Sequence, residues 1–254
     1  MNLISKYVGA GMTRRLRVRV LPNLKYLTRS QFRRCRACGK STVFIQLGPD
    51  EEYRLCFHCS ANLRYELLYE YLSQAQPLES LDVLELDPDS PLRPLLSRAR
   101  TYIRSYFRSN LERGSVGAGG ARVEDITALT FGDESLDLIV SSDVLEHVPD
   151  AQAAFKESFR VLRPGGKHIF TVPNEPRTIQ RAVLEGGSVQ HVETPEYHSD
   201  PLDPAGILAF WHYGPDMQEQ FQDSGLRFTV VKGPEGVRKS IVWVAEKPRA
   251  ASGP

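Results

Sequence analysis

Long hydrophobic segments are absent from this chain of 254 residues. No apolar run approaches the roughly 18 residues that a helix needs to span a bilayer, and the first residues lack the uninterrupted hydrophobic segment of a signal peptide. We therefore expect no transmembrane segment and a cytoplasmic location. The hydrophobic fraction of 41% and the charged fraction of 25% are those of an ordinary globular protein. The length suits one full-size domain with a small appendage.

Acidic residues are absent from residues 1–34, which contain nine Lys or Arg residues. The rest of the chain carries 23 basic and 31 acidic side chains, so the formal net charge of +1 hides an asymmetry. One interpretation is that residues 1–34 contact nucleic acid or an anionic membrane surface. We favour the other, a solvated segment that partly packs on the main domain, because no aromatic residues interleave with the charges as a base-stacking surface would require.

Cysteine is scarce, and all four cysteines lie in one short stretch. They form the pattern Cys35-x-x-Cys38, then 17 residues, then Cys56-x-x-Cys59. Two CxxC pairs at this spacing are typical of a structural zinc site, in which each pair supplies two thiolates. Four ligands leave no open position, so we expect the zinc to stabilise the fold and not to activate water. Two disulfides or a redox CxxC are the alternatives, and His58 is interpreted as a bystander.

Residues 136–173 carry the clearest pattern of secondary structure. The apolar run at 136–140 predicts a strand buried on both faces. Asp150 can cap a helix whose apolar residues recur at spacings of three and four, and the glycine-containing turn at 163–166 is expected to end it. A second strand follows at 169–172. This βαβ unit places polar residues at the carboxyl ends of parallel strands, where open α/β sheets bind ligands.

The motifs SSDVLEHVPD and FRVLRPGGKHIFTVP in this unit resemble the second half of a class I methyltransferase of the type 11 family, which uses S-adenosylmethionine. The resemblance extends from about Leu81 to the end of the chain. It implies a Rossmann-like, doubly wound α/β fold with seven mostly parallel strands and an antiparallel C-terminal strand. A generic βαβ unit of another Rossmann-like enzyme is the alternative.

The domain organisation follows from these patterns, and the element around the cysteines is also similar to the small zinc ribbon found ahead of some bacterial methyltransferase domains. We expect a basic N-terminal segment (1–34), a zinc ribbon with a docking helix that Ser60 caps (35–73), a linker (73–80), a methyltransferase domain (81–247) with a substrate-side loop insertion (174–206), and a tail (248–254) that is disordered from about Lys247. Near the end, we expect a helix at 214–224 stopped by Gly225, then two strands, at 226–231 and 241–245, joined by a turn containing Gly233, Pro234 and Gly236.

The chain departs from the family at two positions that the resemblance assigns to the methyl donor. The strand at 81–86 is followed by the sequence DPDSP, where the family has a glycine-rich loop. Because the donor carries an ammonium and a sulfonium, we expect Glu85, Asp87 and Asp89 to complement it electrostatically. The strand at 101–105 is followed by Tyr106, at the position of the family's ribose-binding acid, and tyrosine offers one hydroxyl or a stacking face. A degenerate domain that retains only the fold is therefore an alternative.

Other donor contacts come from the resemblance alone. Asp125, beside Ile126, matches the acid that contacts the adenine amino group, with a turn aspartate as the alternative. Three residues after the strand at 136–140 would border the donor: Ser141, Ser142 and Asp143. His147 would touch the methionine moiety or act as a base, or else pack at a helix entry. The glycine cluster at 114–120 is interpreted as a flexible loop.

Residues 174–206 lack periodicity and are interpreted as a lid or binding loop on the ligand side. Glu196, Tyr197, His198 and Asp200 would gather an acid, a base and hydrogen-bonding groups beside the donor. A loop held by its own polar contacts is the alternative.

The predicted reaction is methyl transfer to a small-molecule or glycan acceptor. Transfer from a sulfonium is an in-line displacement, for which the protein supplies proximity, alignment and a suitable field. A base is needed only when the acceptor must lose a proton, and His147 and His198 are the candidates. A nucleic-acid methyltransferase that grips its substrate through residues 1–34 and the ribbon is less favoured, and a non-catalytic scaffold is the third hypothesis.

Overall fold

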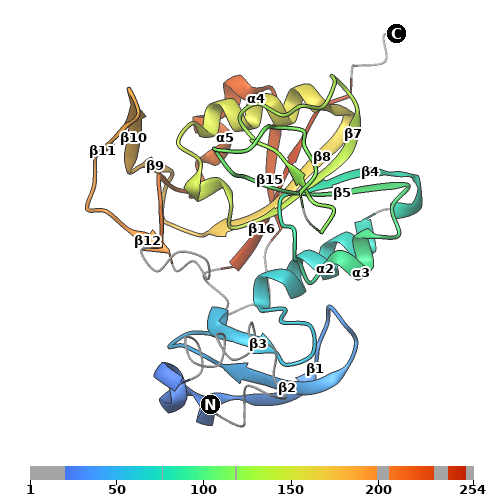
Figure 1. The fold of residues 1–254 in the computed structure, drawn as a ribbon, viewed down its shortest axis with the longest axis vertical. Helices are drawn as coiled ribbons and strands as arrows, with labels where there is room; N and C mark the ends of the chain where they lie inside the picture. Colours follow the sequence, from blue (N-terminus) through green and yellow to red (C-terminus); the bar gives the residue numbers. More distant parts are fainter. Residues whose placement is uncertain (1–20, 76, 118, 199–205, 232–239, 250–254) are drawn as a thin grey trace. The chain divides into compact units, whose positions relative to one another are not determined.

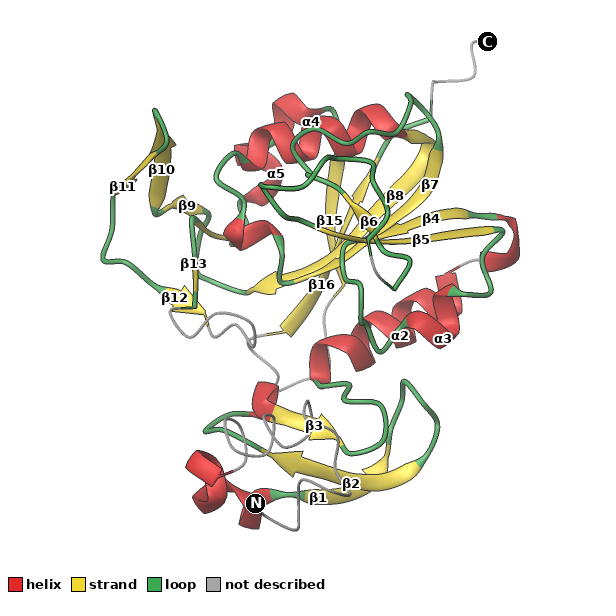
Figure 2. Ribbon diagram, viewed as in Figure 1, coloured by secondary structure: helices red, strands yellow, loops and turns green. Residues whose placement is uncertain are grey.

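The computed structural model describes residues 21–75, 77–117, 119–198, 206–231 and 240–249. The chain divides into two compact units, Met1–Glu70 and Tyr71–Pro254, and each has a sheet of its own. Figure 1 labels the longer helices and many of the strands of both units, and Figure 2 distinguishes helices, strands and loops. Most of the basic residues predicted to form a solvated segment lie at 1–20, outside the described residues.

The first unit contains a three-stranded antiparallel sheet in the order β1-β2-β3. Its elements are η3 (Leu21–Arg29), β1 (Gln31–Arg34), β2 (Ser41–Gln46), η4 (Glu51–Tyr53) and β3 (Arg54–Cys56). Phe44 on β2 lies opposite Cys56 on β3 and is fully buried. The other buried members of its core are Cys35, Ala37 and Ala61. Small domains with a core of this size usually rely on a cross-link or a bound metal for stability.

Helix α2 (Leu63–Ala75) confirms the predicted helix but not its predicted cap. Asn62 precedes the helix, and its side-chain oxygen accepts a hydrogen bond from the Tyr65 amide at 3.3 Å. Ser60 instead has a φ of +63° and lies in the turn after Cys56, to whose carbonyl its own amide donates. The predicted linker at 73–80 is largely helical, because α2 continues to Ala75 and η5 (Leu78–Ser80) follows. Docking of the ribbon through this helix stays a prediction.

The second unit is built on a seven-stranded sheet in the order β15-β16-β8-β7-β4-β5-β6. Its elements are β4 (Asp82–Glu85), α3 (Arg93–Leu96), β5 (Thr101–Tyr106), β6 (Arg122–Val123), β7 (Leu136–Ser142), η6 (Leu145–His147), α4 (Ala151–Val161), β8 (Leu162–Pro173), β15 (Arg227–Val231) and β16 (Ser240–Glu246). Five adjacent strands run parallel to one another, in the order β8, β7, β4, β5 and β6. Strand β16 is antiparallel to both β8 and β15. This arrangement confirms the predicted doubly wound fold.

The order of the parallel strands reverses at the pair β4 and β7. From β4 the sheet grows through β5 to β6, and the chain then returns to the other side of β4 to form β7 and β8. Leu84 pairs with Ile139 and Glu85 with Val140, so the two carboxyl ends are level. A reversal of this kind leaves a crevice beyond the carboxyl ends of the two strands, which is where open α/β sheets bind ligands.

Helix α4 connects β7 to β8 and packs on the sheet through aromatic side chains. Asp150 caps it as predicted, since Oδ1 accepts a hydrogen bond from the Ala153 amide at 2.8 Å. Phe155 is fully buried and lies 5.9 Å from Phe170 on β8, between ring centroids. The helix ends at Val161, before the predicted turn at 163–166, which belongs to β8. That turn forms the register shift of β8 against β7, because Leu136 pairs with Leu162 but Leu138 pairs with Lys167.

The insertion at 174–206 has more regular structure than the sequence predicted. It contains β9 (Ile179–Gln180), β10 (Ala182–Glu185), β11 (Ser188–His191) and β12 (Tyr197–His198), and β13 (Ile207–Leu208) and β14 (Trp211–His212) follow it. Strands β10 and β11 form a hairpin whose two turn residues, Gly186 and Gly187, have φ values of +56° and +81°. A two-residue Gly-Gly turn is a known hairpin signal, and it was overlooked because the second strand, β11, is polar and exposed at all four positions.

The C-terminal part of the chain follows the prediction with two corrections. The predicted helix at 214–224 is two short pieces, α5 (Met217–Gln220) and η7 (Gln222–Ser224), and Gly225 ends them at a φ of +81°. Lys247 is ordered, because its amide donates to the Gly166 carbonyl at 2.9 Å and its Nζ lies 3.0 Å from Oε1 of Glu134. The predicted turn at 233–236 lies outside the described residues. Among the described residues, no helix has the length and apolar character needed to cross a membrane.

Replacing Gly225 by alanine should destabilise the second unit more than the same change at Gly187, although both residues have a φ of +81°. The left-handed backbone costs an alanine roughly 1–2 kcal/mol at either position. Only at Gly225 would the new Cβ also meet a neighbour, 2.8 Å from Cε2 of Phe159, whereas nothing lies within 4 Å at Gly187. Urea denaturation of the two variants measures the difference. Equal losses of unfolding free energy would show that the Phe159 contact contributes nothing.

Candidate functional site

The four cysteine sulfurs of the first unit converge on one point. The Sγ atoms of Cys35 and Cys59 are 3.7 Å apart, those of Cys38 and Cys56 are 3.9 Å apart, and all four lie within 4.8 Å of one another. A zinc ion bonded to four sulfurs at about 2.3 Å would separate them by about 3.8 Å. Disulfide bonds need about 2.05 Å and are excluded by these distances. The residues therefore fit the metal that the sequence pattern predicts.

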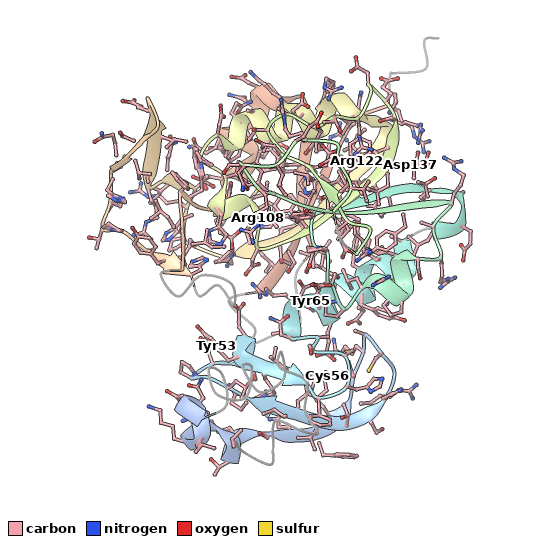
Figure 3. The ribbon with its side chains drawn as sticks, in the orientation of Figure 1. Tyr53, Cys56, Tyr65, Arg108, Arg122 and Asp137 are labelled. Atoms are coloured by element: carbon pink, nitrogen blue, oxygen red, sulfur yellow. The ribbon has the colours of Figure 1, made fainter. Side chains whose placement is uncertain are left out.

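The two CxxC turns have the same backbone hydrogen bonds. The Cys35 amide donates to the Lys40 carbonyl and the Cys56 amide to the Ala61 carbonyl, each at 2.9 Å. Residues four positions after each first cysteine, Gly39 and Ser60, have φ values of +70° and +63°. Cys56 is labelled in Figure 3, and both first cysteines are buried. His58 is exposed and does not belong to the sulfur cluster.

In the second unit, the end of β4 presents a buried acid. Glu85 is 1% exposed, and its Oε2 accepts a short hydrogen bond from the Tyr102 hydroxyl. Burial raises the pKa of Glu85 to about 7, although the hydroxyls of Ser90 and Tyr102 oppose this. The predicted donor acid is thus held inside the β4–β5 layer by its neighbours. Asp89 is exposed, and its amide donates to Oδ1 of Asp87 at 2.9 Å.

Arg104 fastens two loops at the same edge of the sheet. Its guanidinium donates 2.5 Å hydrogen bonds to the Pro88 carbonyl in the loop after β4 and to the Gly119 carbonyl in the glycine cluster. Tyr106, two residues further on the same strand, packs its hydroxyl against Gly117, where an added Cβ would overlap it. The glycine cluster is therefore a shaped turn, not merely a flexible loop. The sequence analysis did not identify Arg104, which lies two residues before the predicted Tyr106 and therefore on the same face of β5.

Asp125 lies just beyond β6, in a turn that it stabilises. Its Oδ1 accepts hydrogen bonds from the Thr127 amide at 2.9 Å and the Thr127 hydroxyl at 2.7 Å. Ile126 is buried in the main core. The contacts are those of the turn aspartate weighed as the alternative, and its contact with adenine stays a prediction. Glu124 beside it is also buried, and its Oε1 lies 2.6 Å from Nε of Arg122, which is labelled in Figure 3.

The last residues of β7 and the residue that follows it face different environments. The Ser141 hydroxyl lies 3.0 Å from Nε2 of His168, inside the core below α4. Burial lowers the pKa of His168 to about 3, which keeps it neutral. Ser142 contacts the Thr171 hydroxyl at 3.1 Å, and that hydroxyl donates to Oδ1 of Asp143 at 3.0 Å. Asp143 has a φ of +50°, a strained backbone of the kind found at functional turns.

The two histidines proposed as bases from the sequence lie together, although 50 residues separate them in the sequence. The rings of His147 and His198 are 4.9 Å apart between centroids and nearly perpendicular. Between them lies the carboxylate of Glu146, whose Oε1 is 3.9 Å from Nε2 of His147 and 3.7 Å from Nδ1 of His198. Glu146 is 1% exposed. The sequence analysis did not identify it, although it directly precedes His147.

The insertion completes this cluster with a second acid. Nε2 of His198 lies 3.3 Å from Oε1 of Glu196, and Oε2 of Glu196 lies 3.0 Å from Nε2 of His212. Arg181 also contacts Glu196 closely. Partial burial raises the pKa of Glu196, but the hydrogen bonds from His212 and Arg181 outweigh it and lower the pKa below its ordinary value. Asp200, predicted beside these residues, lies outside the described part of the chain.

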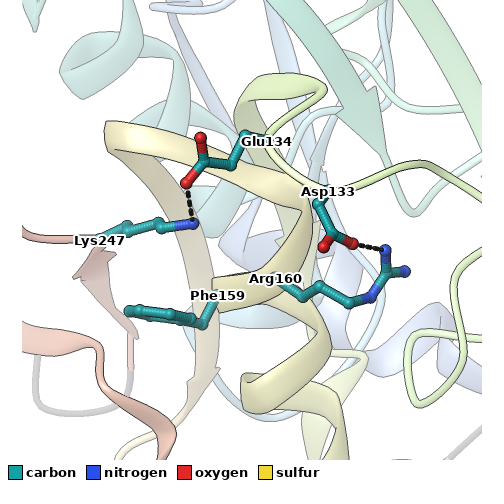
Figure 4. A pocket seen from close by; sticks show the side chains of 5 residues that line it. All are labelled: Asp133, Glu134, Phe159, Arg160 and Lys247. Atoms are coloured by element: carbon teal, nitrogen blue, oxygen red, sulfur yellow. Dashed lines mark hydrogen bonds and ion pairs between the residues drawn. The ribbon is translucent and has the colours of Figure 1, made fainter.

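A surface hollow of about 460 Å³ lies at the other end of the sheet (Figure 4). It is lined by Asp133, Glu134, Phe159, Arg160 and Lys247. Its charges pair with each other, Glu134 with Lys247 at 3.0 Å and Asp133 with Arg160 at 2.7 Å. Because Asp133 and Glu134 precede β7, the hollow is at the amino end of that strand and not at its carboxyl end.

Residues 96–170 match the family model described as a methyltransferase domain. Among curated proteins, the chain is similar to a sarcosine/dimethylglycine N-methyltransferase of Halorhodospira halochloris, with 31% identity over 91 residues, which is 34% of this chain and 32% of that protein. It is also 34% identical over 50 residues to phosphoethanolamine N-methyltransferase 2 of Caenorhabditis elegans, covering 20% of this chain and 11% of that protein. The chain therefore spans about a third or less of the length of these relatives.

Two solved structures are similar to the chain at low sequence identity. An S-adenosylmethionine-dependent methyltransferase from Mesorhizobium loti has a TM-score of 0.46 and 16% identity, over 70% of this chain and 96% of that one. A methyltransferase of the same class from Methanosarcina mazei has a TM-score of 0.40 and 21% identity, over 68% and 94%. Within the seven-stranded sheet of the second unit, the methyltransferase-domain match covers β5, β6, β7 and most of β8.

Proposed function

We propose that the chain is an S-adenosylmethionine-dependent methyltransferase that acts on a small-molecule or glycan acceptor. The observation that carries this proposal is the methyltransferase-domain match over residues 96–170, which runs from β5 through most of β8 and includes the carboxyl end of β7 but not β4. The names of two similar proteins give small acceptors, sarcosine or dimethylglycine and phosphoethanolamine, which supports an acceptor of this size.

The donor would bind at the carboxyl ends of β4, β5, β6 and β7. Asp87 and Asp89 supply negative charge beside the end of β4, where an ammonium or sulfonium would be favoured. Oδ1 of Asp125 accepts both hydrogen bonds from Thr127, so Oδ2 can accept one from an adenine amino group. Tyr106 offers a ring face to the nucleoside in place of a ribose-binding acid. Ser141 is assigned no donor contact, because its hydroxyl is bonded to His168.

The cluster at His147 and His198 would lie on the acceptor side. When bound, the donor supplies an electrophilic methyl group on sulfur. The chain aligns the two molecules and, for a hydroxyl acceptor, removes the proton that the acceptor loses as the new bond forms. His147 suits this role, because Nδ1 lies 2.9 Å from the Leu208 carbonyl and donates to it, so that in the neutral ring Nε2 carries the lone pair.

The four cysteines of the first unit would hold a structural zinc ion. Burial raises the pKa of Cys35 to about 11, so the thiol stays protonated until a cation replaces the proton. The ion would stabilise the fold of this unit, because a small apolar core alone rarely stabilises a sheet of this size.

Nucleic acid is a second class of acceptor, favoured by one observation. Tyr26 lies beside Lys25 at 4.9 Å and Arg29 at 5.8 Å, from cation to ring centroid, so an aromatic residue does accompany the charges of residues 1–34, contrary to the sequence analysis. Arg33 is not available for such contacts, because it is bonded to Glu66 at 2.6 Å and covers the Phe44 ring.

A non-catalytic scaffold is the third hypothesis. It is supported by Glu85 and Arg104, because their side chains form hydrogen bonds within the protein at the strand ends where the donor would bind.

Calorimetric titration of the full chain with S-adenosylmethionine should show binding, and Asp125→Asn should weaken it about tenfold, the effect of losing one hydrogen bond to the amine. The matched control is Asp133→Asn, at the amino end of the sheet, which should bind as the wild type does. Asn retains an oxygen for Thr127, so the turn is preserved. No heat at several hundred micromolar donor would contradict the methyltransferase proposal and favour the scaffold.

Purified protein should retain zinc at the cysteine cluster after dialysis, and Cys38→Ser should lose it, because a serine hydroxyl is a poor zinc ligand. Cobalt substitution provides the readout, since only thiolate coordination gives an intense near-ultraviolet charge-transfer band. The control His58→Ala should keep the band. Equal spectra for wild type and Cys38→Ser would refute the zinc assignment.

A further inference from the structure

We propose that Glu146, His147 and His198 form a second metal site, separate from the cysteine cluster, for a divalent first-row transition-metal ion such as Zn²⁺. The site lies just beyond the carboxyl end of β7, where η6 meets the insertion. It stands on its own geometry and does not depend on methyl transfer, and an ion bound there would exclude Nε2 of His147 from the role of base.

The three side chains already converge at close to metal-binding distance. One ligand atom from each lies within 4.8 Å of the other two. A zinc ion with ligands at about 2.0–2.2 Å would bring these atoms to about 3.3 Å from one another. The present distances from Oε1 of Glu146, 3.9 Å and 3.7 Å, need a contraction of well under an ångström.

Hydrogen bonds outside the three residues leave the correct nitrogens for a metal. Nδ1 of His147 is bonded to the Leu208 carbonyl at 2.9 Å, so Nε2 carries the lone pair that points toward Glu146. Nε2 of His198 is 3.3 Å from Oε1 of Glu196, a contact that favours the tautomer with its proton on Nε2 and its lone pair on Nδ1. Metal-binding histidines are typically held in this way, by a carbonyl or a carboxylate on the other ring nitrogen.

Contacts with the rest of the fold hold both segments that carry the cluster, η6 and β12. The Phe210 amide donates to the Glu146 carbonyl at 2.7 Å, and the Tyr213 hydroxyl donates to the Leu145 carbonyl at 3.0 Å. His198 is held in β12 by its pairing with Ile207. The two histidines therefore come together because η6 is hydrogen-bonded to Phe210 and Tyr213, and because β12 pairs with β13 in the same segment.

The chemistry of the three groups selects the ion. A carboxylate buried to 1% exposure is costly to ionise, and a divalent cation compensates that cost more fully than neutral imidazoles do. Two imidazoles and one carboxylate suit Zn²⁺, Fe²⁺, Co²⁺ or Ni²⁺ better than Mg²⁺ or Ca²⁺, which prefer oxygen ligands. Three protein ligands leave at least one position for water or for an oxygen of a bound molecule.

The test is calorimetric titration of Zn²⁺ into full-length protein whose cysteine site has first been filled with one equivalent. Wild type should bind one further equivalent, and His198→Ala should weaken that step at least a hundredfold. Glu196→Gln, which loses only the support of His198, should weaken it about 10–100-fold. The control His191→Ala changes an exposed histidine of the same insertion and should bind as the wild type does.

A thermal melt provides a second readout that a folding defect cannot imitate. Excess Zn²⁺ should raise the melting temperature of wild type and of His191→Ala, but not that of His198→Ala or Glu146→Gln. Identical second-step binding in wild type and His198→Ala would overturn the proposal, as would the absence of that step from wild type. Because the donor plays no part in either measurement, failure here leaves the methyltransferase proposal untouched, and the donor titration can fail while the metal binds.

Discussion

The parallel pairing of β4 with β7 is the constraint on which the second unit depends. It joins the two halves of the sheet and sets their strand ends level, through Leu84 with Ile139 and Glu85 with Val140. Both strands are buried on both faces, so a slip in register would expose apolar side chains and bury the polar residues that follow each strand. The positions of the loops after β4, β5, β6 and β7, and so of all the predicted donor residues, follow from this one pairing.

Local sequence patterns predicted the parts of the fold that local physics determines. The apolar run of β7, the Asp150 cap and the spacing of the four cysteines each act over a few residues or through a repeated motif, and the structure contains all three. The errors arose where a residue had two plausible roles. Ser60 can cap a helix, but the turn after Cys56 requires a left-handed residue there, and Asn62 takes the cap. The turn at 163–166 can end a helix, yet it serves as a bulge in β8.

The candidate site was predicted in part, because its members come from separate segments. His147 and His198 were chosen one at a time, and nothing in their spacing indicates that their rings meet. Their contact depends on the short pairings of β12 with β13 and of β14 with β9, which involve two residues on each strand and are too short to read as periodicity. Glu146 was overlooked for a similar reason. The sequence Glu-His is the same whether the glutamate is exposed in a turn or buried behind the histidine, so the sequence does not reveal the burial.

Arg104 makes the two loops that border the end of β5 behave as a unit. A single guanidinium is bonded to the backbone on both sides, so movement of either loop away from the sheet must break a bond or carry the other loop with it. The two loops are consequently expected to move away from the sheet together, and a substitution near Gly119 would affect Pro88 through Arg104. A glycine-rich loop closes over a ligand because its own backbone is flexible. In this chain, the loop after β4 is instead held in place by the side chain of Arg104.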